Sequence, residues 1–351
     1  MTHRERLDRV FAGGVPDTTA ILGGWIADPN LLIGAAGVSR DEYAGDPMRY
    51  MVKAHENLGI DGLIAIMGMD VDRWRIVDEH SYIGASLNDD FDAFVRAVEA
   101  LPSADEVERS FDFDAEYATF AAELKQTQAQ CGELVYMPAQ WSAGARASWF
   151  QTYGYENFFM LVALHPKLAG KLFAIGGAEG YNRGRLIARA VGEGLYPKAV
   201  LLGEDVCAQR GPMMSVDFLM EYYVPALAHG LEPLLNAGIR PVWHCDGNVM
   251  PMLPMLFECG IQGLQGFQPE CGMKIEELVK LRTREGRKLL IFGPMSVTTE
   301  LNALTSKEIE RLVRHHVEIC RDTADLVYFT ANTINPDVPL ENLLTMYRTL
   351  K

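Results

Sequence analysis

Eight short apolar runs, separated by longer amphipathic stretches, constrain the fold more than any other feature of this sequence. Each run is too short for a helix. Several are rich in Val, Ile and Leu, which is typical of strands buried on both faces of a sheet. The runs are Thr19–Trp25, Gly62–Met67, Leu134–Met137, Ala199–Gly203, Pro241–His244, Gly263–Phe267, Lys288–Phe292 and Leu326–Phe329.

The stretches between these runs predict helices. Thr305-Ser306-Lys307-Glu308 matches a capping box, and apolar residues recur at helical spacing behind it. Pro47–Leu58 and Asp217–Leu231 have a similar pattern. Strands that alternate with helices predict a single α/β domain over residues 1–351, a (β/α)8 TIM-type barrel. Extra helices are expected in the long intervals after the second and third strands. A doubly wound open sheet is the alternative, because a strand count cannot establish closure.

Composition and charge narrow the class of protein. Of the 351 residues, 48% are hydrophobic and 23% are charged, an ordinary globular balance. The net charge of −15 argues against nucleic acid as a partner, because phosphate backbones would be repelled. No long apolar stretch predicts a membrane span and no apolar signal core occurs, so we expect a cytoplasmic protein. The six cysteines contain no CxxC pair, and most are expected to be small buried side chains.

In a barrel of this kind, substrate and catalytic groups meet at the carboxyl ends of the strands. Acids, amides and a histidine follow the predicted strands, within a frame of Met and Trp residues. Such a rim suits a small, partly apolar ligand or a metal ion. Any one of these residues could instead be a loop residue that faces water. The expected substrate-binding residues are Trp25, Met69, Gln140, Gln268, Met295 and Asn332.

The most informative stretch is Val242-Trp243-His244-Cys245-Asp246-Gly247-Asn248, at the end of the fifth predicted strand. Side chains alternate along a strand, so His244 and Asp246 share one side while Cys245 points to the other. We therefore expect His244 and Asp246 to be catalytic, through a bound metal ion or proton transfer, and Cys245 to be a packing residue. The alternative is a histidine that is hydrogen-bonded in the barrel mouth and binds no ligand.

Glu204 and Glu221 are the candidate metal-ligating partners of His244. Glu204 ends the fourth predicted strand, which neighbours the fifth in a barrel, and Glu221 lies on the helix between them. Two carboxylates and one imidazole would make a zinc site with an open position, as catalytic zinc requires. The spacing is not a specific motif, however, and Glu221 fits a solvated helix face equally well.

Several segments, in this order and spacing, resemble the uroporphyrinogen decarboxylase superfamily almost from end to end of the chain. The resemblance implies a (β/α)8 barrel. The segments are Arg4-Glu5-Arg6-Leu7 with Gly14-Val15-Pro16-Asp17, Tyr153-Gly154-Tyr155-Glu156-Asn157 with His165-Pro166, His244-Cys245-Asp246-Gly247, and Pro339-Leu340-Glu341-Asn342.

The superfamily includes decarboxylases and corrinoid-dependent methyltransferases. The decarboxylases grip substrate carboxylates with N-terminal arginines, and the corresponding segment Gly23–Pro29 has no arginine. The methyltransferases move a methyl group between a small substrate and cobalt on a separate corrinoid protein. In the coenzyme M branch, zinc is held by an H-x-C pair and a late cysteine. Asp246 and Asn332 stand at those cysteine positions, so the sequence is more similar to relatives that demethylate methyl ethers.

The resemblance thus implies a methyltransferase that takes a methyl group from a small methoxylated donor and uses zinc as a Lewis acid on the ether oxygen. Asp246 would tune the imidazole of His244 or donate a proton to the leaving oxygen. No DxHxxG-like signature occurs, so the corrinoid would belong to the partner protein. Two alternatives remain open. One is a metal-independent decarboxylase in which Asp246 and Glu204 do the acid–base chemistry, and the other is a non-catalytic barrel that binds a small molecule.

Overall fold

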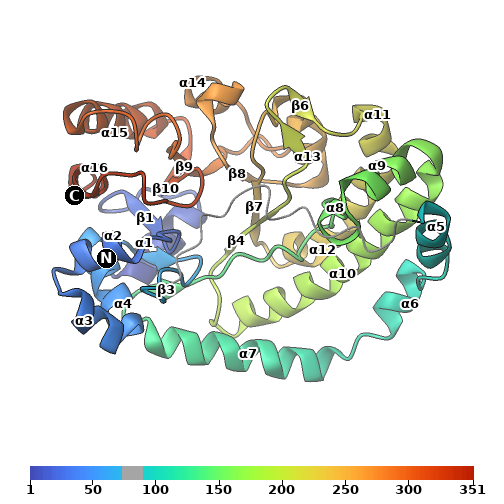
Figure 1. Ribbon diagram of the computed structural model, residues 1–351, viewed down its shortest axis with the longest axis horizontal. Coiled ribbons are helices and arrows are strands. Elements are labelled where there is room, and N and C mark those ends of the chain that lie inside the picture. Colours follow the sequence, from blue (N-terminus) through green and yellow to red (C-terminus); the bar gives the residue numbers. More distant parts are fainter. Residues whose placement is uncertain (73–89) are drawn as a thin grey trace.

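The computed structural model describes residues 1–72 and 90–351, and a sheet of eight parallel strands forms its centre (Figure 1). Each predicted apolar run contributes one strand. The strands are β1 (Ala20–Gly23), β2 (Gly62–Leu63), β3 (Val135–Tyr136), β4 (Ala199–Gly203), β7 (Arg240–His244), β8 (Gly263–Gln265), β9 (Leu290–Met295) and β10 (Asp325–Thr330). A short antiparallel ribbon, β5 (Cys207–Ala208) with β6 (Gly211–Pro212), follows β4.

The strands follow one another around the sheet in chain order, and the last strand, β10, pairs with the first, β1. The sheet has its two ends at β3 and β4. There the backbone N–H of Gln140 donates a 2.8 Å hydrogen bond to the carbonyl of Leu201 in β4. The sheet therefore curls back on itself, as expected for the predicted TIM-type barrel. The doubly wound alternative, whose strand order reverses within the sheet, does not fit this order.

Helices surround the sheet and include the extra ones predicted in the long intervals (Figure 1). Helices α5 to α7 lie between β2 and β3, and α8 to α10 lie between β3 and β4. The α-helices are α1 (His3–Phe11), α2 (Pro29–Ala36), α3 (Arg40–Gly45), α4 (Pro47–Leu58), α5 (Phe91–Glu99), α6 (Ala104–Arg109), α7 (Phe113–Gln130), α8 (Phe150–Tyr153), α9 (Tyr155–Leu164), α10 (Pro166–Gly192), α11 (Val216–Phe218), α12 (Val224–Asn236), α13 (Leu253–Cys259), α14 (Ile275–Leu278), α15 (Ser306–Cys320) and α16 (Leu340–Thr349). A π-helical turn, η2 (Leu219–Tyr223), precedes α12, and two 3₁₀ turns are η3 (Met250–Met252) and η4 (Pro269–Cys271).

Burial explains why the strands are apolar on both faces. Every residue of β1, β4, β7 and β9 is buried. Helix α15 shows how a helix covers the sheet with an apolar face, because it buries Ile309, Val313 and Cys320. Its start has the predicted capping box, in which the N–H and hydroxyl of Thr305 donate to the Glu308 carboxylate. Five of the six cysteines are buried, as predicted.

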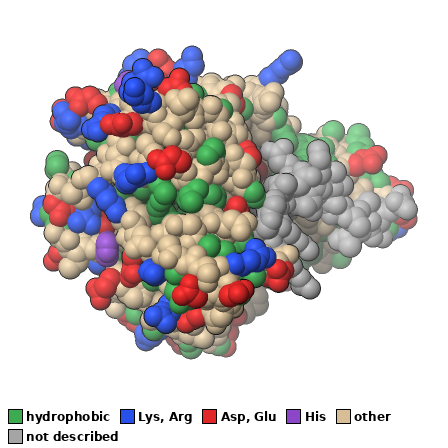
Figure 2. Space-filling model, turned by 60° about the vertical axis from the view of Figure 1, so that its left-hand side comes forward, with side chains coloured by type: hydrophobic (Ala, Val, Ile, Leu, Met, Phe, Trp, Pro, Cys, Tyr) green, Lys and Arg blue, Asp and Glu red, His purple; other side chains and the backbone are tan. Residues whose placement is uncertain are grey.

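The helical surface carries charges of both signs. On the face drawn in Figure 2, acidic and basic side chains are interspersed. On α15, Arg314 pairs with Glu310, and Arg321, directly after the helix, pairs with Glu318. Such exposed pairs contribute little to stability, about 0.3–0.5 kcal/mol each. Within the described residues, no single helix has both the length and the apolar character to cross a membrane, although α9 and α10, bent by 117°, meet those two criteria jointly.

Candidate metal centre

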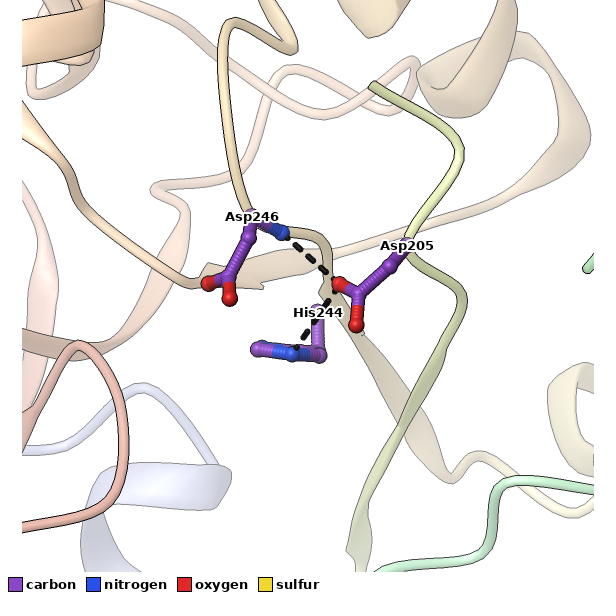
Figure 3. A group of neighbouring side chains, drawn as sticks. All are labelled: Asp205, His244 and Asp246. Atoms are coloured by element: carbon purple, nitrogen blue, oxygen red, sulfur yellow. Dashed lines mark hydrogen bonds and ion pairs between the residues drawn. The ribbon is translucent and has the colours of Figure 1, made fainter. Parts of the chain in front are cut away.

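Three side chains with metal-binding groups meet at the carboxyl ends of β4 and β7 (Figure 3). His244 is the last residue of β7, Asp246 lies two residues beyond it, and Asp205 lies two residues beyond β4. The two strands pair in parallel with Gly203 opposite His244, and this register brings their ends together. One ligand atom from each of the three side chains lies within 4.8 Å of the others.

The Asp205 carboxylate interacts with both of the other residues. One of its oxygens lies 3.5 Å from Nε2 of His244 and accepts a 3.0 Å hydrogen bond from the backbone N–H of Asp246 (Figure 3). Two carboxylates therefore concentrate negative charge around one edge of a single imidazole ring. His244 is buried, whereas the Asp205 side chain is 47% exposed, so the group is open to solvent on one side.

Two glycines permit the close approach of these strand ends. Gly203 has φ +129°, and a Cβ there would lie 2.2 Å from the carbonyl oxygen of His244. Gly247 has φ +83°, and a Cβ there would lie 2.7 Å from the carbonyl oxygen of Ala208 in β5. Both positions combine a backbone conformation that favours glycine with too little space for any side chain.

Gln265, at the end of β8, determines which nitrogen of His244 carries a proton. Its Nε2 donates 2.8 Å hydrogen bonds to the carbonyls of Thr330 and Ala331, so its amide oxygen must be the atom that faces Nδ1 of His244. Because that oxygen can only accept, Nδ1 carries the hydrogen. In the neutral ring, the lone pair is then on Nε2, which faces Asp205.

Two of the predicted substrate-binding residues hold the segment around Asp246. Nδ2 of Asn332 donates to the Asp246 carboxylate over 2.6 Å, while its Oδ1 accepts from the N–H of Thr333. The side-chain oxygen of Gln268 accepts a 2.6 Å hydrogen bond from the N–H of Gly247. These contacts fix the direction of the Asp246 side chain and the path of the turn that follows it.

Aromatic rings cover the imidazole of His244. Trp25, also predicted at the substrate site, lies edge-on to this ring with centroids 5.6 Å apart. Trp141 lies 5.4 Å from it and stacks against Trp25 at 6.2 Å. Trp25 is buried, but Trp141 is 42% exposed, which is unusual for so large an apolar side chain. Trp141 therefore offers an apolar surface at the entrance to the group.

The predicted ligand Glu204 is not one of the three grouped side chains. Adjacent residues point in different directions as the chain leaves β4, and the Glu204 carboxylate accepts hydrogen bonds from the N–H (3.3 Å) and hydroxyl of Ser148. Burial raises the pKa of Glu204 to about 7, although the Ser148 hydrogen bonds and the Arg146 charge lower it. Its neighbour Asp205 supplies the carboxylate near His244 instead.

The second predicted carboxylate ligand, Glu221, is also outside the group. It is exposed and lies in the π-helical turn η2, where its carboxylate raises the pKa of the adjacent Tyr222. This is the solvated helix face that the sequence left open as an alternative.

The side chains of the other three predicted substrate-binding residues, Gln140, Met295 and Met69, contact other parts of the fold. The amide of Gln140 accepts from Arg183 (2.8 Å) and donates to the carbonyl of Pro138 (2.9 Å). Met295 is fully buried in a core cluster that Met69 also packs against. Among the described residues, none of the three forms a hydrogen bond with His244.

Sequence reasoning did not assign roles to Asp205 or Gln265. Asp205 directly follows the predicted ligand Glu204, and a strand pattern cannot tell which of two adjacent acids turns toward a neighbouring strand. A signal for Gln265 did exist, because it is a polar residue within the apolar run Gly263–Phe267. A polar side chain inside a buried strand requires a hydrogen-bond partner.

The donor set fits a divalent cation such as zinc. One imidazole nitrogen with an available lone pair and two carboxylates are ligands that zinc accepts, and the exposed side of Asp205 leaves room for another ligand. Metal-binding histidines usually donate their second N–H to an oxygen acceptor, which fixes the ring. Gln265 performs this role for His244.

Comparison with known proteins identifies a similar fold but assigns the chain to no family. No protein family model and no curated protein sequence matches the chain. Among solved structures, a methyltransferase from Methanosarcina mazei has a similar fold, with a TM-score of 0.66 and 14% sequence identity. The match covers 100% of this chain and 98% of that one. At this identity the likeness establishes a shared architecture along the whole chain.

Proposed function

We propose that this protein is a methyltransferase that takes a methyl group from a small methoxylated compound and passes it to a corrinoid on a separate protein. A divalent metal ion, zinc in the first instance, would be held by His244, Asp205 and Asp246. One observation carries the proposal. The imidazole of His244 is oriented by Gln265 so that Nε2 faces the Asp205 carboxylate, and the Asp246 carboxylate belongs to the same group at the carboxyl end of the barrel. That end is where enzymes with this architecture bind their substrates.

The chemistry requires help for a poor leaving group. A methyl ether does not release an alkoxide or phenoxide readily, and a bound zinc ion would supply Lewis-acid stabilisation of the negative charge on that oxygen. In the overall transfer, the bond between the methyl carbon and oxygen breaks and both electrons stay on the oxygen. The methyl group would pass to the reduced cobalt of the partner, which would supply the electron pair of the new bond.

The residues of this chain would bind the metal ion and orient its ligands and the methyl donor. His244 and the two aspartates provide the ligand atoms, and Gln265 keeps the proton of His244 on Nδ1. Asn332 aligns the Asp246 carboxylate. Trp25 and Trp141 shield the imidazole face from water, and the exposed part of Trp141 provides an apolar surface for the donor molecule. The corrinoid protein would have to dock over this end of the barrel to reach the donor.

Two further observations support methyl transfer and this branch of enzymes. The fold is similar over the whole chain to that of a solved methyltransferase. The His244-x-Asp246-Gly247 strand end also resembles the demethylases of the uroporphyrinogen decarboxylase superfamily. Membership of that branch is part of the proposal.

The test combines the purified protein, zinc, a panel of methoxylated aromatic and aliphatic compounds, and reduced cobalamin as a substitute acceptor. Formation of methylcobalamin, followed by its absorption spectrum, is expected with wild-type protein and with Glu221→Gln. It should be lost in His244→Ala. Methyl transfer by His244→Ala at the wild-type rate, or no transfer from any compound by zinc-loaded wild-type protein, would contradict the proposal.

The second candidate function is a metal-independent decarboxylase, and the environment of Glu204 favours it. A carboxyl group with a pKa of about 7 can donate or accept a proton at neutral pH. This function predicts that metal-free protein releases carbon dioxide from a carboxylated substrate and that Glu204→Gln stops the release. Retention of that activity by Glu204→Gln would exclude Glu204 as the acid.

A further inference from the structure

A second concave site lies at the opposite, amino-terminal end of the barrel. It is a pocket of about 490 Å³ between α1 and the residues where β4, β7 and β9 begin. Its charged lining consists of Arg4, Asp8, Lys198, Arg240 and Arg287. Phe11, Ala12 and Val191 give the rest of the wall an apolar character. The pocket volume falls in the usual range for small-molecule sites.

The charge of this pocket is opposite to that of the whole chain. Four basic side chains and one acidic side chain line it, whereas the protein carries a net charge of −15. Arg4 is neutralised by Asp8 at 2.8 Å. In the described part of the chain, neither Lys198 nor Arg287 forms an ion pair, and both are exposed. Two of the cations that line the pocket therefore have no ion-pair partner among the described residues.

Arg240 adds a buried donor to the pocket wall. Its side chain is only 2% exposed, and its terminal nitrogens bond Asp325 (2.6 Å) and the carbonyl of Lys288 (2.8 Å). Its Nε has no hydrogen-bond partner among the described residues. Arg240 therefore contributes positive charge to the pocket wall, while its terminal nitrogens are bound within the fold.

We propose that this pocket binds the phosphate group of a small organic phosphate ester. Arginine and lysine side chains that converge on one cavity match the negative charge and acceptor oxygens of phosphate. The cavity is larger than an inorganic phosphate ion, and its apolar wall at Phe11 and Val191 has room for an organic part. The proposal does not depend on the function proposed for the other end of the barrel.

The test is isothermal titration of the full-length, metal-free protein with inorganic phosphate, pyrophosphate and glycerol 2-phosphate at constant ionic strength. The variant Lys198→Ala/Arg287→Ala removes the two unpaired cations from exposed positions, so folding should be preserved. The control Arg314→Ala/Arg321→Ala removes the same charge from α15 and the residue that caps its end, where the arginines pair with Glu310 and Glu318 of α15.

Wild-type protein and the α15 control are expected to bind glycerol 2-phosphate saturably and more tightly than inorganic phosphate. The pocket variant should bind it at least about tenfold more weakly, since charge-assisted contacts are lost. Three results would overturn the proposal. They are no saturable binding of any probe, equal weakening in the two variants, and equal affinity of wild-type protein for inorganic phosphate and the ester.

Discussion

The two ends of strand β7 use buried polar side chains in different ways. At its start, Arg240 is held by an ion pair with Asp325 and by backbone carbonyls, so most of its donors are bound within the fold. At its end, the His244 ring is held through Nδ1, and Nε2 faces the Asp205 carboxylate in a group that also contains Asp246. The comparison suggests that Arg240 mainly stabilises the barrel, whereas His244 is positioned to bind a cation.

The largest expected effect is at the carboxyl end. His244→Ala should lower the rate of methyl transfer by about a thousandfold or more, because a lost Lewis acid removes several kcal/mol of transition-state stabilisation. The rate of methylcobalamin formation measures this. His315→Ala is the matched control, since His315 is half exposed on α15 and pairs with Glu276. Equal losses in the two variants would contradict the assignment.

Arg240→Met should affect stability and not the metal. It leaves the Asp325 carboxylate, which is 9% exposed, without its counter-charge, and breaking such a pair costs about 3–5 kcal/mol. Urea unfolding measures the loss. The double variant Arg240→Met/Asp325→Leu should recover a large part of it. If Arg240→Met lost zinc while remaining folded, the two ends of β7 would not be independent.

Gln265→Leu tests whether the orientation of His244 matters. It removes the acceptor for Nδ1–H, and loss of such a partner typically weakens metal binding by about 10–100-fold. Competition with a chromophoric chelator gives the affinity. Unchanged affinity in Gln265→Leu would show that Gln265 does not orient a ligand.

Glu300 follows β9 at the same end of the barrel, and its carboxyl group is largely buried. Burial, and the nearby Glu270 and Glu276 charges, raise the pKa of Glu300 to about 7, although the N–H of Ser296 lowers it. The unfolded chain ionises at a lower pH, so the folded state loses stability as the pH rises from about 5 to 8. Glu300→Gln should remove about 1–2 kcal/mol of this loss. Urea unfolding of both proteins at pH 5 and pH 8 gives this difference. An equal change in the free energy of unfolding between the two pH values in the variant and the wild type would contradict the assignment.

The smallest effect is expected on the helical surface. Arg314→Ala on α15 removes an exposed pair with Glu310 and should cost about 0.5 kcal/mol or less at either pH. Thermal unfolding measures it. A loss comparable to that of Arg240→Met would show that the contrast between buried and exposed charges is wrong.

The sequence predicted the architecture better than the direction of individual side chains. The eight strands were recognisable because parallel strands buried on both faces are apolar along their whole length. The shared side of His244 and Asp246 followed from strand alternation. Both features depend on residues that are close in the sequence, so they are visible as periodic patterns of apolar and polar residues.

The choice between Glu204 and Asp205 could not be predicted in this way. It depends on how the backbone leaves β4 at Gly203 and on Ser148, which is 56 residues away and bonds Glu204. The hydrogen bond from Arg183 to the side chain of Gln140, 43 residues away, is likewise a long-range contact. Such contacts follow from the packing of separate elements and leave no periodic signal in the sequence.

The most direct test of the central claim is zinc content, measured by mass spectrometry on protein purified without chelator and then supplied with zinc. We predict about one ion per chain in wild-type protein, Glu204→Gln and Glu221→Gln, and none in His244→Ala or Asp205→Asn/Asp246→Asn. Zinc that persists in His244→Ala, or a wild-type protein that takes up no zinc, would contradict a metal centre at His244, Asp205 and Asp246.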